Sequence, residues 1–187
     1  YTAADANVRI GDLIEYELRL GLQEGTHTNV SVTDTLPTGL QYVEMVSAAC
    51  FGTPCAAIPV PVVGGQTLTW SLGTVVNPSG STNDVLVLRY RVRVLNNDVF
   101  AQTPVSQTLT NNATLSYTVA GNPVTQPSTA SVTVLQPILT VSKSAAPAGG
   151  DTVINAGEVI TYTVDILNSG AAPAYDMVLV DTLPVGL

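Results

Sequence analysis

Two short motifs occur twice in this 187-residue chain, at nearly the same separation. The first, Gly-Asp-Leu-Ile-Glu-Tyr at residues 11–16, is echoed by Gly-Glu-Val-Ile-Thr-Tyr at residues 157–162. The second, Asp-Thr-Leu-Pro-Thr-Gly-Leu at residues 34–40, returns as Asp-Thr-Leu-Pro-Val-Gly-Leu at residues 181–187. The offsets of 146 and 147 residues differ by one insertion, which chance does not readily produce. The chain therefore contains one structural repeat and the opening of the next.

Apolar and polar residues alternate along the repeats with a period of two, which is typical of a half-buried β-strand. Between residues 84 and 95, the positions expected to face a core are Leu86, Leu88, Tyr90, Val92 and Val94. The opposite, solvent-facing positions are Arg89, Arg91 and Arg93. The same alternation runs through residues 13–20, with Glu15 and Glu17 facing outward, and through residues 160–166.

Further strands are expected at residues 28–33, 42–46, 67–72, 108–119 and 128–135, so the first repeat contains about seven strands separated by turn-rich pieces. Charged residues make up 11% of the chain, which leaves little material for helices covered with surface ion pairs. Together these features predict an all-β chain of tandem immunoglobulin-like repeats, each an antiparallel two-sheet β-sandwich.

The sequence Leu-Gln-Pro at residues 135–137 interrupts the last strand of the first repeat, and a fresh alternating run begins at Ile138. We therefore expect residues 1–137 to form a sandwich that lacks its first strand, and residues 138–187 to form about three opening strands of a second repeat. Two explanations are open. The chain is either an arbitrary fragment of a long array or a natural unit whose leftover strands complete a neighbour.

Composition and charge disfavour several functional classes. The net charge of −8 repels a phosphate backbone, so nucleic acid is not an expected partner. No apolar run approaches the roughly 20 residues of a membrane-spanning helix, and the start at Tyr1 suggests an internal cut or a processing site. With one histidine and no catalytic or phosphate-binding motif, neither enzymatic activity nor a cofactor is expected, and Glu15 and Glu17 face outward rather than into a pocket.

The chain resembles the prokaryotic repeats called DUF11, the conserved repeat domain of surface antigens. The resemblance rests on the entry strand at 139–143, the repeated motifs described above, the Asn-Ser-Gly turn at 168–170, and the stretches at 70–74 and 109–114. It implies an extracellular protein of a bacterial or archaeal surface, acting as a stalk, an adhesin or a filament component.

Cys50 and Cys55 flank Phe-Gly-Thr-Pro, which allows the backbone to fold back and bring the two thiols together. We expect a disulfide bond, because an extracellular setting favours oxidation; a pair of free thiols is the alternative. A metal site is not favoured, since His27 lies on a separate strand and four good ligands are not apparent. A surface position is expected for His27.

Lys143, the only lysine, lies in the entry strand, which is where some extracellular sandwiches carry a lysine that forms an intramolecular isopeptide bond to an asparagine. Its partner would be the counterpart of Asn111 or Asn112 in the second repeat, and those two residues would pair with a lysine upstream of Tyr1. In the alternative, Lys143 extends into water, and Asn111 or Asn112 bonds the backbone at a strand irregularity.

Three further groups of polar residues have weaker signals. Asn29 and Asn112 begin Asn-x-Ser/Thr triplets, which are acceptors for N-glycosylation in a host with that pathway. The acidic residues considered for calcium near a domain junction are Asp12, Asp151 and Glu158. Their spacing matches no recognised calcium loop, so solvated carboxylates are the expected state.

The sequence thus favours a structural repeat of a secreted or cell-surface protein. It acts as a stalk or spacer, or as a filament subunit, and its partners are neighbouring copies, joined by strand complementation in one version. The alternative is an adhesive module in which exposed loops such as 50–65 contact carbohydrate or a surface protein.

Overall fold

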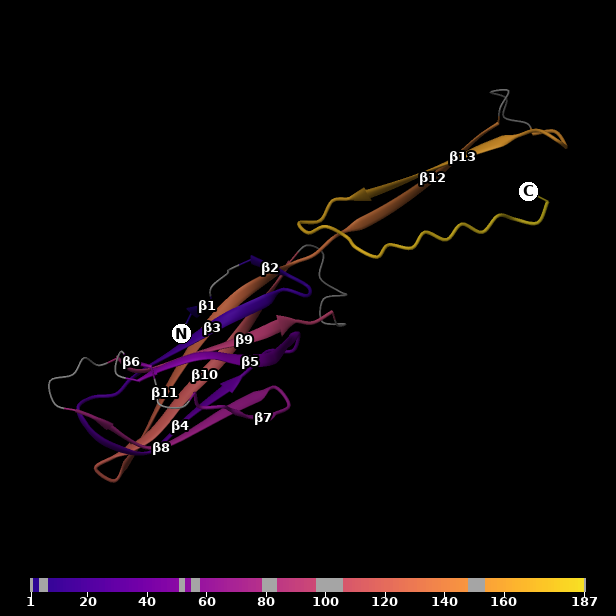
Figure 1. Cartoon of the computed structure of the whole chain (residues 1–187). Coiled ribbons are helices and arrows are strands. Elements are labelled where there is room, and N and C mark those ends of the chain that lie inside the picture. The colour runs from indigo at the N-terminus through magenta and orange to yellow at the C-terminus, as the bar shows by residue number, and fades with distance from the viewer. Residues whose placement is uncertain are drawn as a thin grey trace. The chain divides into compact units, whose positions relative to one another are not determined.

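The computed structural model describes residues 2–3, 7–50, 53–54, 58–78, 84–96, 106–147 and 154–186. These residues form strands, turns and irregular connections, with no helix among them, so none of the described segments is an apolar helix of membrane-spanning length. The chain divides into two compact units, Tyr1–Leu135 and Gln136–Leu187 (Figure 1). The dividing point lies just before the Pro-containing stretch, and each unit is described separately below.

Two sheets build the first unit. The first sheet has the order β1 (Thr2–Ala3), β3 (Leu13–Gly21), β9 (Asp84–Val94), β5 (Leu40–Cys50) and β6 (Thr53–Pro54). The second has the order β2 (Asn7–Arg9), β11 (Asn122–Leu135), β10 (Ser106–Val119), β4 (Gly25–Thr35), β8 (Thr67–Asn77) and β7 (Val62–Gly64). Neighbouring strands are antiparallel except β2 and β11, which pair in parallel over three residues.

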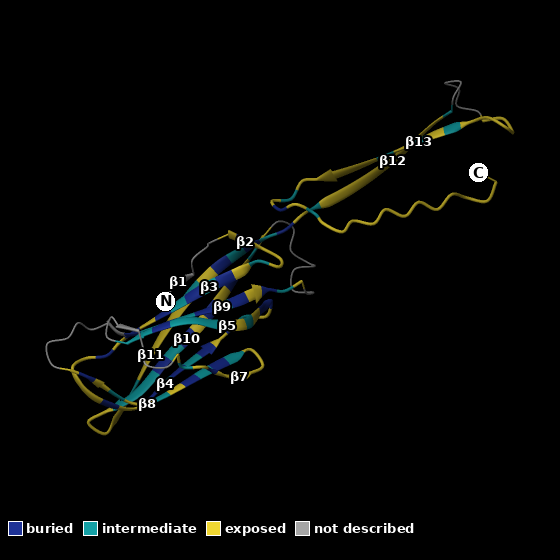
Figure 2. Ribbon diagram, viewed as in Figure 1, coloured by how far each residue is buried: buried dark blue, intermediate teal, exposed yellow. Residues whose placement is uncertain are grey.

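The core lies between the two sheets and is built from the faces that the alternation predicts. Tyr16 pairs with Tyr90 and Leu18 with Leu88 in the central β3–β9 ladder, and all four side chains are buried. Directly opposite residues of an antiparallel pair share one face, so this register places the apolar sides of both strands together. The prediction of an all-β, immunoglobulin-like sandwich is confirmed, and Figure 2 shows its buried positions following the strands of the first unit.

The N-terminal segment contributes to both sheets. Thr2 and Ala3 pair antiparallel with Glu17 and Tyr16 of β3, whereas β2 lies beside the last residues of β11 in the other sheet. The segment therefore lines the open side of the sandwich, where the outer edges of β3 and β11 lie.

The structure corrects several expected strand limits. β5 runs from Leu40 to Cys50 rather than from 42 to 46, and β11 begins at Asn122 rather than at 128. β8 continues to Asn77 rather than ending at 72. The short strands β1, β2, β6 and β7 carry too few residues to show alternation, which explains why the sequence did not indicate them.

In the second unit, β12 (Leu139–Pro147) and β13 (Ile160–Asn168) pair antiparallel over nine residue pairs. The stretch from 175 to 186 follows without strand structure. Its apolar side chains are exposed, with Val178 at 85% and Val180 at 79%. The expectation of three strands is therefore wrong for the described residues, because no partner strand lies beside this stretch to hydrogen-bond with it.

The repeated motifs fold into the same turns in both units. Gly11 and Gly157 both have φ of 92°, and Gly39 and Gly186 have φ of 106° and 107°. The Arg9 amide donates to Asp12 Oδ2 at 2.8 Å, and the Asn155 amide donates to Glu158 Oε2 at 2.7 Å. Each glycine adopts a left-handed conformation that costs other residues energy, so the motif glycines specify these turns.

Candidate functional site

A chain of hydrogen bonds crosses the core of the first unit. Tyr90 Oη, from β9, donates to Asp34 Oδ2 of β4 at 2.7 Å. Asn111 Nδ2, from β10, donates to Tyr90 Oη at 3.0 Å. Asp34, Tyr90 and Asn111 are each 0% exposed. Because the three strands belong to both sheets, this cluster links the two layers from inside.

Aromatic rings surround this polar cluster. Tyr16 stacks on Tyr90 with ring centroids 5.7 Å apart, and Trp70 of β8 tilts against Tyr90 at 5.5 Å. Burial, together with the nearby Asp34 carboxylate, raises the pKa of Tyr16 well above its ordinary value. A carboxyl group in such a place is costly unless it is hydrogen-bonded, and the Tyr90 hydroxyl supplies one such bond.

The second unit carries the counterpart of this cluster in a more open form. Asp181 and Tyr162 align with Asp34 and Tyr16 in the repeated motifs. Lys143 Nζ lies 2.6 Å from Asp181 Oδ1 and 4.3 Å from the centroid of the Tyr162 ring. The Lys143 and Asp181 side chains are 35% and 38% exposed. Lys143 therefore takes part in an ion pair and a cation–π contact.

The two asparagines considered as isopeptide partners differ in their surroundings. Asn111 is buried in the cluster described above, whereas Asn112 is exposed and donates to the Thr110 carbonyl at 3.4 Å. The alternative expected a backbone bond for Asn111 at a strand irregularity, whereas Asn111 donates to the side-chain hydroxyl of Tyr90. Asn112 is also an N-glycosylation candidate, and it lies within β10, where it pairs with β11 on one side and β4 on the other.

His27 is buried, with 2% of its surface exposed, so the expected surface position is wrong. Its Nε2 lies 2.8 Å from the Gln23 carbonyl oxygen, and its ring meets Tyr117 edge-on at 5.2 Å. His27 is the first buried position of β4, which starts at Gly25.

The remaining candidates lie apart from the core cluster. Asn29 is exposed at an irregularity of β4 with φ of 53°, a conformation that asparagine tolerates better than most residues. Cys50 is the last residue of β5, while Cys55 lies outside the described residues, so the disulfide bond stays a prediction. Asp151 lies outside them as well, and no group of three candidate metal ligands occurs in the described part of the chain.

The charged side chains expected on the outer face of the first sheet pair with one another. Glu17 Oε1 accepts from Arg19 Nε at 2.6 Å, and its Oε2 accepts from Arg89 Nε at 2.8 Å. Arg91 contacts Glu15 at 3.5 Å and Glu44 at 3.0 Å. Burial acts to raise the pKa of Glu17, but the two arginines outweigh it and lower the pKa.

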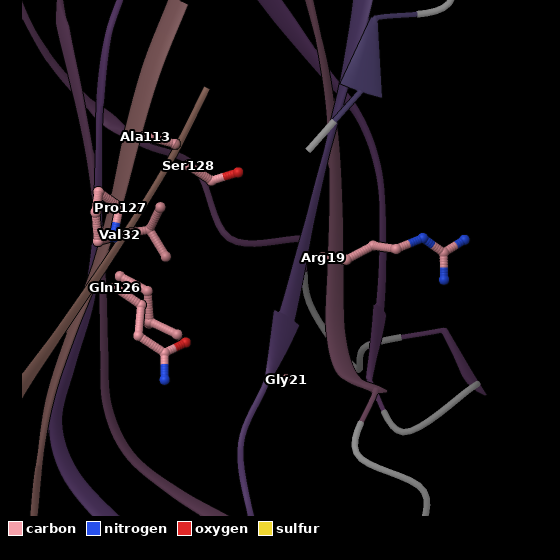
Figure 3. A pocket seen from close by; sticks show the side chains of 8 residues that line it. Arg19, Gly21, Val32, Ala113, Gln126, Pro127 and Ser128 are labelled. Carbon is pink, nitrogen blue, oxygen red and sulfur yellow. The ribbon is translucent and has the colours of Figure 1, made fainter. Parts of the chain in front are cut away.

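A cleft opens between the two sheets on the side where β3 and β11 have their outer edges. It has a volume of about 110 Å³ and is lined by Arg19, Gly21, Val32, Ala113, Leu115, Gln126, Pro127 and Ser128. Figure 3 shows the residues of β4, β10 and β11 on one side and Arg19 and Gly21 of β3 across from them, with the Arg19 side chain directed away. Aliphatic side chains of the core thus form part of its lining.

No protein-family model matches the chain, and no curated protein matches it in sequence. Solved structures with a similar fold include a variant of BcpA, the major pilin subunit of Bacillus cereus, with 17% identity and a TM-score of 0.51. That match covers 87% of this chain and 52% of the pilin chain. BcpA itself has 17% identity and a TM-score of 0.50, covering 88% and 55%.

Domains D2 and D3 of the major pilin SpaD from Corynebacterium diphtheriae have 14% identity and a TM-score of 0.48, covering 80% and 55% of the two chains. The chain spans about half the length of these pilin structures. At this level of identity the BcpA matches show a shared immunoglobulin-like fold.

Proposed function

We propose that the chain is a structural repeat of an extracellular or cell-surface protein, serving as a stalk or spacer or as the building unit of a filament. The observation that carries the proposal is a two-sheet sandwich followed along the chain by a second unit that has a matching turn, at Gly11 in the first and Gly157 in the second. Such tandem units give length and stiffness without a catalytic site. The fold shared with the BcpA pilin is consistent with this use.

The proposal includes that this chain is a member of the DUF11 repeats. Three parts of its sequence signature have a structural role in this chain that supports the proposal. The Asp of Asp-Thr-Leu-Pro enters the core cluster as Asp34, and the aromatic residue of the first motif stacks there as Tyr16. The Asn168 carboxamide oxygen accepts from the Ile138 and Gly170 amides at 3.1 and 3.0 Å. Added atoms at Gly170 would overlap the Ile138 backbone, so this turn requires glycine.

The location is tested by labelling intact cells. An antibody raised against the folded chain should decorate the surface of unpermeabilised cells of the source organism, along projections where it forms them. Protease treatment of those cells should remove the signal. Signal that appears after permeabilisation alone would contradict an extracellular structural role.

Strand complementation between copies is the proposed mode of association. Unpaired strand edges are templates for a further strand, and both β12 and the stretch from 175 to 186 expose apolar side chains. Sedimentation at increasing concentration should show head-to-tail oligomers of this chain. Val141 is 59% exposed. If the Val141→Asp variant no longer forms these oligomers, the result supports strand complementation. A parent chain that stays monomeric at every concentration contradicts it.

A covalent version of the same idea concerns Lys143. In a completed second repeat, an asparagine placed like Asn111 would lie near Lys143 and Asp181. The lysine nitrogen would then bond to the asparagine carboxamide carbon, and ammonia would leave. Intact-mass measurement of a fragment that extends through the second repeat tests it: loss of one ammonia, abolished in Lys143→Arg, is expected, and an unmodified mass contradicts it.

The proposed Cys50–Cys55 disulfide bond closes a small loop after β5. Thiol titration of the denatured, unreduced protein should detect no reactive group, and two groups should appear after reduction. Two reactive thiols before reduction would contradict the bond.

An adhesive role is the second candidate, and one surface feature favours it. Ile58, Val60, Val62 and Val63 are between 49% and 74% exposed on and before the edge strand β7. An apolar surface of this kind is typical of contact with a partner. Arrays of glycans and matrix proteins test it: specific binding that is lost in a Val60→Ser, Val62→Ser variant would support adhesion, and an absence of binding would contradict it.

A further inference from the structure

We propose that the turn at residues 168–172 fixes the connection between the two repeats, so that the chain passes from one repeat to the next without a free linker residue. This turn and residues 136–138, all of which belong to the second unit, are called the linker clamp below. The inference rests on the proposed role as a structural repeat and specifies how neighbouring repeats are joined. Connections between domains are ordinarily exposed, flexible segments that few contacts cross.

The linker clamp begins directly where the first unit ends. Leu135, the last residue of β11, is paired on both sides, with β10 and with β2. The next residue, Gln136, is already bonded within the second unit. Its carbonyl oxygen accepts from the Ala171 amide at 3.0 Å and from the Ala172 amide at 3.3 Å. No residue lies between β11 and the first of these bonds.

The backbone bonds continue on the other side of Pro137. The Ile138 carbonyl oxygen accepts from the Ser169 amide at 2.9 Å. The Ile138 amide donates to Asn168 Oδ1 at 3.1 Å. Pro137 has no amide hydrogen, so it adds no donor that needs a partner between these bonds. Leu139 then forms the first pair of the β12–β13 ladder. The bonds of the linker clamp therefore extend this ladder backwards along the connection.

One side chain joins the connection to the turn. Asn168 Oδ1 accepts from the Ile138 amide and also from the Gly170 amide, the latter at 3.0 Å. Asn168 Nδ2 donates to the Ala172 carbonyl oxygen at 2.9 Å. An asparagine carboxamide has both an acceptor with two lone pairs and a donor, whereas an ionised aspartate has acceptors alone. Asparagine can therefore make all three of these bonds.

Gly170 allows the turn to lie directly against the connection. A Cβ atom at this position would overlap the Ile138 nitrogen and the Gln136 carbonyl oxygen, and it would lie 2.6 Å from the Pro137 carbonyl carbon. These atoms are backbone, so they cannot move aside as the end of a flexible side chain can. An alanine at this position would therefore separate the turn from the connection.

Burial also favours the bonds at one end of the linker clamp. Gln136 and Ala172, which share a backbone bond, are 7% and 6% exposed. They are the two buried residues among those that the structure describes in the second unit. Water has little access to this bond, and a hydrogen bond shielded from water is electrostatically stronger than one in solvent.

A connection of this kind transmits a pull or a twist between repeats, because it contains no slack segment that extends first. It also resists proteolysis, since exposed and flexible segments are the preferred sites of cleavage. Pro137 does not have this effect by itself. Proline fixes its own φ and restricts the residue before it, but it does not hold the residues that follow. The bonds of Asn168 and the close approach at Gly170 are therefore the features to remove in a test.

The experiment measures backbone order parameters by NMR relaxation in the whole 187-residue chain. In the parent, the amides of Gln136 and Ile138 should have values of about 0.85, which is typical of a rigid backbone. In Asn168→Ala and in Gly170→Ala, both values should fall below about 0.6. The Ile138 amide should also exchange with solvent at least about tenfold faster in these variants. Values below about 0.6 in the parent, or no change in either variant, would overturn the proposal.

Matched variants separate the linker clamp from a general effect of substitution. Asn155→Ala changes an asparagine of another turn in the second unit, and Gly64→Ala adds a Cβ that meets no atom within 4 Å. Both should leave the order parameter of Ile138 unchanged. Asn168→Asp keeps the acceptor oxygen and should retain most of the order at Ile138. If Asn168→Asp lost as much order as Asn168→Ala, the role assigned to the Oδ1 bonds would be overturned.

Brief digestion with thermolysin, which cleaves before aliphatic residues, gives a second measurement. The parent should resist cleavage before Ile138 and Leu139, and Gly170→Ala should be cut there while its Trp70 fluorescence stays that of the parent. A parent that is cut as fast as the variant would overturn the proposal. Labelling of intact cells tests the extracellular role independently, so a failure of the linker clamp and a failure of the proposed function are distinguishable.

Discussion

The two units begin with the same motifs and the same turns, yet their equivalent residues have very different surroundings. Leu20 is 4% exposed, whereas its counterpart Ile166 is 43% exposed. Asp34 is buried and bonded to Tyr90, whereas its counterpart Asp181 is 38% exposed and bonded to Lys143. The local sequence therefore specifies the turn and the strand, but burial depends on strands contributed from far along the chain.

The comparison has a thermodynamic meaning. A two-stranded hairpin is marginally stable by itself, and three or more strands with a covered apolar face are needed for independent stability. β3 gains this cover because β9 pairs with it and the second sheet closes over it. β13 has the same alternation and one described partner, β12. The first unit should therefore dominate the cooperative unfolding of the chain.

Substitution at equivalent core positions should produce the largest contrast. Leu20→Ala removes buried methyl groups from the sandwich and should lower its free energy of unfolding by about 2–5 kcal/mol. Ile166→Ala should change that free energy by less than about 0.5 kcal/mol, because its side chain is already partly in water. Urea unfolding followed by circular dichroism and by Trp70 fluorescence measures both. Equal losses would show that the second unit is as well packed as the first.

The polar cluster should show the next largest effect. Tyr90→Phe removes the hydroxyl that donates to Asp34 and accepts from Asn111, so each of these two buried polar groups loses one hydrogen bond. We expect a loss of about 1–3 kcal/mol in the free energy of unfolding. Tyr117→Phe is the matched control, since its hydroxyl accepts an exposed bond from Gln126. A loss no greater than that of the control would show that the cluster does not stabilise the contact between the two sheets.

The sequence predicted the sandwich because alternation reports which side of a strand is buried. The core positions of β3 and β9 and the outward arginines were correctly predicted for this reason. It did not indicate the role of Asp34, because an acidic residue in a turn motif is normally expected to be solvated. Its buried partner, Tyr90, lies 56 residues away in the sequence. The burial of His27 was missed for a related reason, since Tyr117, which covers it, comes from β10.

The cleft was also beyond the reach of the sequence. The absence of a first strand was expected from the repeat pattern, but that pattern does not show which edge stays open or what lines it. The order of the strands in the two sheets and the side chains of β3, β4, β10 and β11 that line the cleft supply this information. It comes from hydrogen bonding between strands and not from residue types.

The dependence of stability on alkaline pH should show a smaller effect, which comes from Tyr16 of the first unit. Burial and the Asp34 charge raise the pKa of Tyr16 in the folded state above its value of about 10 in the unfolded chain. Its contribution to stability is therefore complete below pH 10 and is lost as the pH rises from there, by about 1 kcal/mol per pH unit. Tyr16→Phe should flatten this part of the stability profile. An identical alkaline slope in the variant would contradict the assignment.

The smallest expected effect lies on the outer face, where only the first unit carries a cluster of charges among the described strands. Glu17 contacts Arg19 and Arg89, whereas its counterpart in the second unit is Thr163. Because the pKa of Glu17 is lowered on folding, its contribution is present above the pKa of the unfolded chain and is lost as the pH falls through the folded value. Glu17→Gln should cost at most about 1 kcal/mol at neutral pH, since such pairs are screened by water and salt.

The same Glu17→Gln variant should show a weaker decline in stability between neutral and acid pH than the parent. Glu44→Gln is the appropriate comparison, because Glu44 is 53% exposed and pairs with Arg91 at the same face. Thermal unfolding at several pH values and at two salt concentrations measures these differences. If Glu17→Gln lost as much stability as Leu20→Ala, the outer ion pairs would rank with the core, and burial would no longer account for the difference between the two units.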